Sequence, residues 1–374
     1  MMQPSFWEQD VMLDADVIVV GAGLVGLQTA LEVRARLPHA RIRVLERGVL
    51  PSGASTRNAG FACFGSLSEL LHDCDTMGES ATAALVERRW QGLQRLRKRV
   101  GDAALGYEQR GGFELLREEE LPALDSLDKV NALLHPVFGH EVFYADPIAP
   151  ARSGFGAQVR VLVGNSLEGQ LHAGMLMQAL ARLAAQQDIS LLAGVRVVSL
   201  EEGDGEVRVH AAAPAPLTLR AARVALCTNG FTRELLPECG IVPARGQVLV
   251  TEPIPGLPWH GTYHLDRGFY YFRNIGERVL LGGARHLHMA AEATTELAVT
   301  DPVQQALERL LNELILPGRK ARIAQRWAGI MGFTADKQPL VRRVSERIVL
   351  GFGCNGMGVA LGADIAGRTA ALLT

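Results

Sequence analysis

Three closely spaced glycines near the start of the chain have the spacing of a phosphate-binding turn. Gly21, Gly23 and Gly26 form GxGxxG between the apolar run Val17–Val20 and a stretch of helical periodicity. Glycine lets the backbone turn tightly there and lets a pyrophosphate approach the N–H groups at the start of the helix. Glu46 lies 20 residues beyond Gly26, at the end of the next apolar run, where a carboxylate can accept hydrogen bonds from ribose hydroxyls. The pattern predicts a dinucleotide site. It disfavours NADP, because a carboxylate repels a 2′-phosphate; the alternative for Glu46 is a solvated acid at a strand end.

Two further glycine-rich segments favour FAD over NAD. Segment 53–60, GASTRNAG, is small and polar, so its backbone, hydroxyls and one cation can lie close to phosphates. Segment 351–358, GFGCNGMG, opens the last helix, whose N-terminus carries roughly half a positive charge. The reduced, anionic ring of a flavin needs such a charge near N1 and O2. Alone, the first could be an ordinary loop and the second a plain strand-to-helix turn; together they indicate a flavin.

Alternating strands and helices must position these segments. A buried strand over 17–20, a helix over 24–37 and a strand over 42–45 make a βαβ unit. Elements of the same kind recur later in the chain. They are a helix from 172, strands at 190–192, 195–200, 207–210, 222–227 and 348–350, and a final helix over 359–373. The turn Gly203, Asp204, Gly205 is expected to close a hairpin.

The remaining segments do not fit this alternation. Residues 80–100 predict a long amphipathic helix, and a proline-rich stretch over 243–258 precedes strands at 263–273 and 279–281. The fold class expected is α/β: a Rossmann-type domain interrupted by a second α+β domain, which carries a mainly antiparallel sheet. The expected segments are 1–79, 160–238 and 325–374 for the first domain, and 80–159 and 239–324 for the second.

Composition and charge exclude several other classes of protein. Hydrophobic residues make up 48% and charged residues 21%, which is typical of a compactly folded chain. A net charge of −2, with no dense run of lysine and arginine beyond 95–99, gives no reason to expect nucleic acid as a partner. No apolar run approaches the ~20 residues that span a bilayer, and the acidic first residues do not resemble a secretory signal.

Cysteine and histidine spacing indicates neither disulfides nor a metal. The five cysteines are scattered without CxxC spacing, which favours a reducing, cytoplasmic location. His286 and His288 form the single HxH, and no acid or cysteine accompanies them, so no metal site is predicted.

In combination these motifs resemble the D-amino-acid oxidase superfamily of FAD-dependent oxidoreductases. The resemblance rests on six segments that occur in the order of that family and extend across nearly the whole chain. They are GxGxxG with Glu46, GASTRNAG, CTNGF, PARGQ, WAGIMGFTADKQPLV and GFGCNGMG. The resemblance implies FAD, oxidation of an amine or amino acid by hydride transfer to flavin N5, and an imine product that water hydrolyses. It also implies that the second domain roofs the flavin.

The resemblance assigns cofactor contacts to several parts of the chain. Those expected around the ADP half and the phosphates are Gly21, Gly23, Leu24, Val25, Gly26, Glu46, Arg47, Ser55, Thr56, Val197, Thr228 and Gly230. Those expected around the ring are Arg57, Asn58, Ala59, Gly60, Gly329, Gly353, Asn355, Gly356, Met357 and Gly358.

Departures from the family pattern bear on how the flavin is attached, which substrates fit and what accepts the electrons. Asn58 and Gly329 stand where relatives attach flavin covalently, so FAD is expected to be non-covalent. Met331 and Cys354 replace two carboxylate-binding arginines of glycine oxidase, and Gly358 replaces a lysine of sarcosine oxidase. Glycine and small D-amino acids are therefore expected to be poor substrates. The lysine that promotes reaction with oxygen would fall near residues 280–281, which are leucines, so oxygen and a redox partner both remain possible acceptors.

Three polar residues are the candidates for contact with substrate. Tyr271 matches an active-site tyrosine of sarcosine oxidase, Arg273 lies two residues on and so on the same strand face, and Arg285 follows a Gly-Gly pair. The alternative is that they meet solvent. Two other functions stay open: oxidation of a 2-hydroxy acid on the same scaffold, and a flavoprotein subunit that needs a partner.

Overall fold

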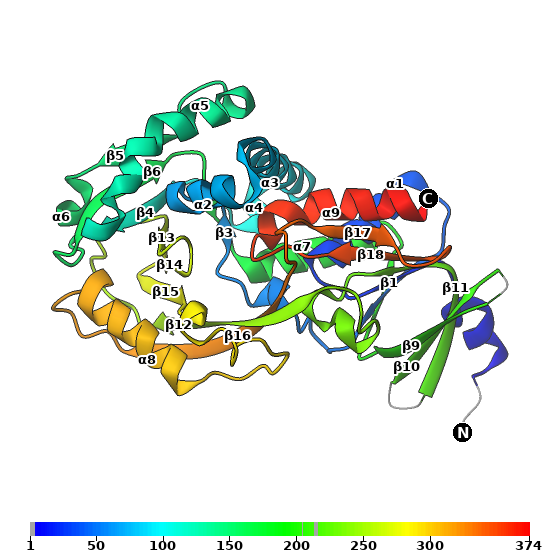
Figure 1. The fold of residues 1–374 in the computed structure, drawn as a ribbon. Coiled ribbons are helices and arrows are strands. Elements are labelled where there is room, and N and C mark those ends of the chain that lie inside the picture. Colours follow the sequence, from blue (N-terminus) through cyan, green and yellow to red (C-terminus); the bar gives the residue numbers. More distant parts are fainter. Residues whose placement is uncertain (1–3, 204, 213–215) are drawn as a thin grey trace.

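The computed structural model describes residues 4–203, 205–212 and 216–374, and its first sheet carries the predicted βαβ unit (Figure 1). The strand order is β17-β18-β11-β1-β2-β8, with β10 also pairing with β11 and β9 with β10. The pairs β1–β2, β1–β11, β2–β8 and β11–β18 are parallel. The strands are β1 (Asp14–Val20), β2 (Ile42–Glu46), β8 (Ser190–Ala193), β9 (Arg196–Glu202), β10 (Val207–Ala212), β11 (Pro216–Leu226), β17 (Leu340–Arg343) and β18 (Ile348–Phe352).

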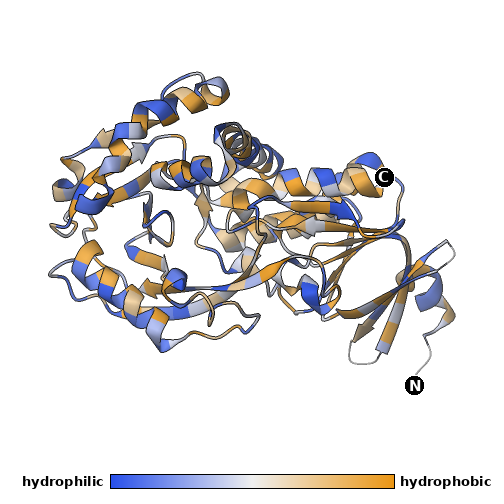
Figure 2. Cartoon of the chain, in the orientation of Figure 1, coloured by the Kyte–Doolittle hydropathy of each residue, from blue (hydrophilic) through white to orange (hydrophobic). Residues whose placement is uncertain are grey.

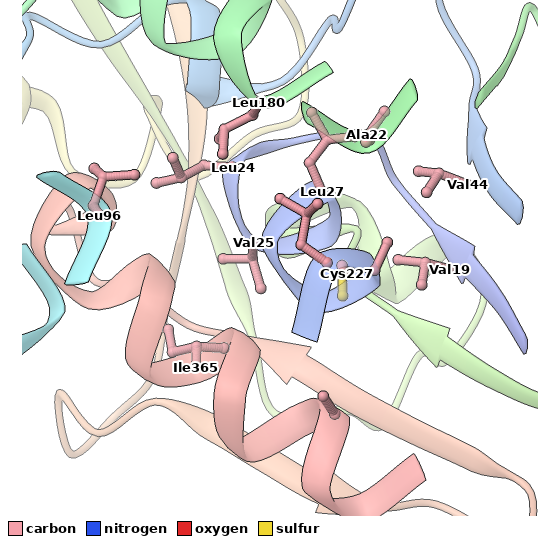
Figure 3. Packing of buried hydrophobic residues seen from close by; sticks show 14 of the residues in the cluster. Val19, Ala22, Leu24, Val25, Leu27, Val44, Leu96, Leu180, Cys227 and Ile365 are labelled. Atoms are coloured by element: carbon pink, nitrogen blue, oxygen red, sulfur yellow. The ribbon is translucent and has the colours of Figure 1, made fainter. Parts of the chain in front are cut away.

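Helices α1 (Leu24–Arg36), α7 (Ala173–Gln186) and α9 (Gly358–Leu373) pack on this sheet, and α3 (Glu79–Val100) packs on α9. A Cβ at Gly92 of α3 would lie 2.0 Å from the carbonyl oxygen of Ala360, so glycine is what lets α3 approach α9. Figure 3 shows Leu24, Leu96 and Ile365 in the buried core between these helices.

The second sheet is mainly antiparallel and has the order β16-β12-β15-β14-β13-β4-β6-β5. Only the pair β4–β13 is parallel among its described strands. The strands are β4 (Gly112–Arg117), β5 (Phe143–Asp146), β6 (Val159–Asn165), β12 (Val242–Thr251), β13 (Thr262–Leu265), β14 (Tyr270–Ile275), β15 (Arg278–Gly283) and β16 (Ile323–Phe333).

The two faces of the second sheet have different roles. On the outer face, α8 (Asp301–Leu310) covers an apolar core that includes Leu249, Phe272 and Leu281. Figure 2 shows hydrophobic and hydrophilic bands alternating along α8, as expected for a helix with one face against a sheet. The opposite face, which carries Tyr271, is the one available to line a site.

The remaining elements lie before and between the strands of the two sheets. They are β3 (Phe61–Ala62), β7 (Gly169–Gln170), α2 (Leu67–Met77), α4 (Asp102–Leu105), α5 (Leu127–Phe138), α6 (Ala149–Ser153) and the short helical turns η1 (Glu8–Leu13), η2 (Ala54–Thr56), η3 (Glu118–Ser126), η4 (Asn229–Glu234), η5 (Arg285–His288) and η6 (Leu311–Ile315). Among the described residues, no helix is both long and apolar enough to cross a membrane.

The structure refines two expectations about local elements. The single strand expected over 263–273 is wrong: β13 and β14 form a hairpin there, because Asp266, Arg267 and Gly268 all adopt positive φ. The hairpin of β9 and β10 is confirmed, although Asp204 in its turn lies outside the described residues.

The sheets also distribute the chain differently from the expected segments. β16, grouped above with the first domain from residue 325, pairs along its length with β12 in the second sheet. β6, similarly grouped from residue 160, pairs there with β4 and β5.

Candidate functional site

A cavity of about 560 Å³ runs between the two sheets. Its volume lies within the range of cofactor and ligand sites. Most of the predicted site residues line it. Those that do are Gly21, Gly23, Leu24, Val25, Glu46, Arg47, Ser55, Arg57, Asn58, Ala59, Gly60, Val197, Thr228, Tyr271, Arg285, Gly329, Asn355, Gly356, Met357 and Gly358. The predicted residues that are not in its lining are Gly26, Thr56, Gly230, Gly353 and Arg273.

The GxGxxG turn is shaped by close backbone contacts. Gly21 has a φ of +103°, and a Cβ there would lie 2.7 Å from the carbonyl oxygen of Cys227. A Cβ at Gly26 would lie 1.8 Å from the carbonyl oxygen of Gly21, so Gly26 serves the packing of the turn. Gly23 is the N-cap of α1 and provides no side chain to cap it. The N–H of Leu24 donates to the hydroxyl of Ser55 from the 53–60 loop at 2.8 Å, and Gly23, Leu24 and Val25 line the cavity, so a pyrophosphate can approach the start of the helix beside Ser55.

Glu46 is fixed at the tip of β2. Its side chain is buried, and one carboxylate oxygen accepts a hydrogen bond from the backbone N–H of Ala22 at 3.1 Å. The other accepts from the N–H of Gly48 at 3.0 Å. Nearby, the Arg47 guanidinium lies 3.7 Å from the centre of the Phe231 ring. Glu46 thus places carboxylate oxygens at the end of the cavity where the sequence predicts the ribose.

The 53–60 loop is clamped onto β16. The side chain of Asn58 donates to the carbonyl oxygens of Ala54 and Ser55 and accepts from the N–H of Gly60. Trp327 donates from its indole nitrogen to the carbonyl oxygen of Arg57 at 3.0 Å. Asn58 thus holds the shape of the loop.

Close contact between this loop and β16 also explains Gly329. A Cβ at Gly329 would lie 3.0 Å from the Cβ of Arg57. A larger side chain would push the loop away from the strand.

The glycine-rich turn before α9 adopts strained conformations that only small or amide residues accept readily. Gly353, Asn355 and Gly356 all have positive φ. Asn355 supports its own turn by accepting from the N–H of Thr334 at 2.8 Å and donating to the carbonyl oxygen of Gly353 at 2.9 Å. Because Met357 provides no side-chain cap, the N-terminus of α9 presents free donors where the turn meets the cavity.

Tyr271 in β14 and Arg285 in η5 are polar residues of the second sheet and the turn that follows it. This part of the protein covers the cavity, and we call it the roof. Tyr271 pairs with Gly282 across β14 and β15, and a Cβ at Gly282 would lie 2.4 Å from Cε2 of the tyrosine, so the ring lies over the glycine. Burial raises the pKa of Tyr271 to about 12, which keeps its hydroxyl protonated. The Arg285 guanidinium lies 4.6 Å from the centre of the Phe333 ring. Burial also lowers the pKa of Arg285.

Arg273 takes a different position from the one expected. It is buried with 6% of its surface exposed, and its Nη2 lies 3.1 Å from the place of a Cβ on Gly60. It therefore packs behind the 53–60 loop. Burial lowers the pKa of Arg273 to about 10, and its Nε has no hydrogen-bond partner among the described residues.

Several cavity residues were missed by sequence reasoning. They are Cys63, Glu69, Arg89, His264, Arg267 and Lys337. His264 could have been found, because it pairs with Tyr271 in the β13–β14 hairpin and so shares its face. Burial lowers the pKa of His264 to about 4, so the imidazole is neutral. Glu69 and Arg89 come from helices α2 and α3, and no spacing in the sequence connects them with the roof.

The cradle of glycines, the fixed acid and the helix N-termini fit FAD, and comparison with known proteins agrees. The family model described as "DAO: FAD dependent oxidoreductase" matches residues 16–372. A relative described as a probable oxidoreductase OrdL, from Haemophilus influenzae, is 24% identical and covers 96% of this chain and 82% of its own.

Solved structures agree in fold. Glycine oxidase from Geobacillus kaustophilus superposes with a TM-score of 0.76 at 21% identity, covering 97% of this chain and 95% of its own. L-proline dehydrogenase from P. horikoshii superposes with a TM-score of 0.77 at 17% identity, covering 97% and 94%. With a family match over nearly its full length, the chain belongs to the DAO family of FAD-dependent oxidoreductases.

Proposed function

We propose that this protein oxidises the C–N bond of an amine or amino acid whose acidic group lies some way from the reacting carbon. The observation that supports this most is the pairing of Tyr271 and Arg285 on the cavity roof. Among the described residues, the Tyr271 hydroxyl has no hydrogen bond, and the side chain of Arg285 donates only to the Sδ of Met289, at 3.0 Å, and forms no ion pair. A partly buried guanidinium without a carboxylate partner, on the same roof as a phenol, is suited to a substrate carboxylate.

The residues around this pair would orient the substrate and exclude water. Bound FAD supplies a hydride acceptor at N5. Arg285 would bind the carboxylate, and Tyr271 would donate a hydrogen bond to the same group. Val248, Val250 and Leu280 form an apolar cluster under the roof, so the reacting carbon would lie in a site with little water.

The 331 and 354 positions support a substrate larger than glycine. Met331 and Cys354 both line the cavity, and neither can pair with an anion close to the reacting carbon. An unpaired carboxylate buried there would cost several kcal/mol. A longer amine, with its acid near Arg285, avoids that cost.

The cofactor is proposed to be held without a covalent bond. Asn58 is occupied by three hydrogen bonds within its own loop, and Gly329 has no side chain to form a tether. Purified protein is therefore expected to be yellow and to release all of its flavin as FAD on acid or heat precipitation. Fluorescence and chromatography of the supernatant measure this; flavin that stays with the precipitated polypeptide would disprove it.

A 2-hydroxy acid that carries a second, more distant carboxylate is the other candidate substrate, because Tyr271 and Arg285 would bind that distant carboxylate as well as they would bind that of an amine. The experiment that separates the two is anaerobic mixing of the flavoprotein with amines and with the hydroxy acids of the same carbon skeleton. Each pair then differs only in the group whose bond to carbon is oxidised. The readout is loss of the visible absorption of oxidised flavin.

A further inference from the structure

Three potential metal ligands from distant parts of the chain meet in the cavity wall. They are Cys63, Glu168 and His264, and one ligand atom of each lies within 4.8 Å of those of the other two. All three residues are buried. No CxxC or HxH spacing marks them, since about a hundred residues separate each from the next.

Strand pairing brings the three together. Phe61 pairs with Gln170 and Ala62 with Gly169 in the β3–β7 ribbon, so Cys63 and Glu168 extend from the same end of it. His264 comes from β13 in the roof sheet. The cluster therefore connects the ribbon to the roof.

The unpaired imidazole of His264 is the strongest indication of a ligand. Its residue is 7% exposed, and neither ring nitrogen has a hydrogen-bond partner among the described residues. A buried histidine of the core normally bonds at least one neighbour, because burying an unpaired polar group is unfavourable. Phe61 packs edge-on against the ring at 5.1 Å between centroids, which fixes its plane without satisfying it.

Glu168 is held in place but has room for another partner. One carboxylate oxygen accepts from the N–H groups of Phe64 at 2.8 Å and Gly65 at 3.3 Å. A separate void of about 10 Å³ is bordered by Glu168 and His264. This is about the size of one water molecule or one ion.

We propose that Cys63, Glu168 and His264 bind a zinc ion, with the fourth coordination position open to the main cavity. One sulfur, one nitrogen and one oxygen donor suit zinc, whereas calcium and magnesium take oxygen ligands alone. A thiolate and a carboxylate balance the two positive charges, so the buried site is neutral overall. The nearby Arg89 guanidinium is paired with Glu69 at 3.2 Å.

The three ligand atoms would have to move only a short distance toward one another to bind zinc. Ligand atoms of a tetrahedral zinc site lie about 3.3–3.8 Å apart, so the cluster has to contract by roughly 1 Å. Cys63 and His264 line the main cavity, whereas Glu168 borders only the small void behind them. The fourth coordination position would therefore face the main cavity. The fourth ligand is then water or a lone-pair donor of a molecule in the cavity. This inference does not depend on which substrate the flavin oxidises.

The test uses the flavin-loaded protein. After treatment with a chelator, it is mixed with a slight excess of Zn²⁺, passed through gel filtration, and assayed for zinc and flavin. We expect about one zinc per flavin in the wild type, and less than about a tenth of that in Cys63→Ser, Glu168→Gln and His264→Gln. Matched controls are Cys74→Ser and the double variant His286→Gln, His288→Gln, which should retain the metal.

A second measurement covers the case in which a variant folds poorly. X-ray absorption of the zinc-loaded wild type should show one sulfur at about 2.3 Å together with nitrogen or oxygen neighbours. Zinc that washes off the wild type, a zinc shell without sulfur, or zinc lost only from the His286, His288 variant would each overturn the proposal and mean an adventitious ion only.

Discussion

Gly358→Val is expected to lower the flavin content of the purified protein by at least about tenfold while the chain still folds. A Cβ at Gly358 meets only ordinary contacts, the nearest being the Cβ of Cys354 at 3.7 Å, so the protein itself accommodates the change. The added methyl groups would extend from the start of α9, where the turn borders the cavity. They would keep the flavin ring from the helix N-terminus, and a loss of only about 1.4 kcal/mol gives a tenfold weaker affinity.

The same helix provides the control. Gly367 also lies in α9, has no atom within 4 Å of its added Cβ, and is not in the cavity lining. Gly367→Val should therefore retain wild-type flavin content. Flavin absorbance per protein after gel filtration, with far-ultraviolet circular dichroism as the check on folding, measures both. Equal flavin content in the two variants would show that the turn before α9 is merely structural.

Arg285→Ala is expected to lower kcat/KM for the amine substrate by about 10- to 150-fold with FAD still bound. The guanidinium is partly buried and, among the described residues, forms no ion pair and donates only to the Sδ of Met289, so a substrate anion would be its main charged contact. Such a charge-assisted hydrogen bond is worth about 1.5–3 kcal/mol. Steady-state kinetics with the best amine, together with flavin content, measures the effect.

Arg273→Ala is the informative comparison, because Arg273 packs behind Gly60 outside the cavity lining. Arg273→Ala should lower the melting temperature and leave kcat/KM close to its wild-type value. The opposite pattern, with Arg273→Ala catalytically impaired and Arg285→Ala like the wild type, would contradict this assignment of the roof.

The sequence could predict the glycine-rich turns that line the cavity because their requirements are local. GxGxxG, Glu46 and the glycine-rich turn before α9 each depend on conformations within a few residues. The buried strand Val17–Val20 was recognisable because both of its faces are covered. These features can therefore be predicted without knowledge of the tertiary contacts.

The roof was harder to predict because it depends on sheet register and on distant pairings. Tyr271 and Arg273 lie two residues apart on one strand, yet only the tyrosine lines the cavity, because the guanidinium of Arg273 packs against Gly60 of the 53–60 loop. That contact joins segments more than two hundred residues apart, and no local pattern encodes it. The same reason hid the cluster of Cys63, Glu168 and His264, since the pairing of β3 with β7 brings the first two together and His264 joins them from β13 of the other sheet.

Anaerobic reduction of the flavin by matched amine and hydroxy-acid pairs tests the central claim most directly. We predict that an amine with a distant carboxylate bleaches the flavin at a rate that saturates with concentration, that glycine and D-alanine do so more slowly, and that the matching hydroxy acid leaves the flavin oxidised. A hydroxy acid that bleaches faster than its amine would contradict C–N oxidation. So would a flavin that no small molecule of either class reduces, a result that points instead to a subunit requiring a protein partner.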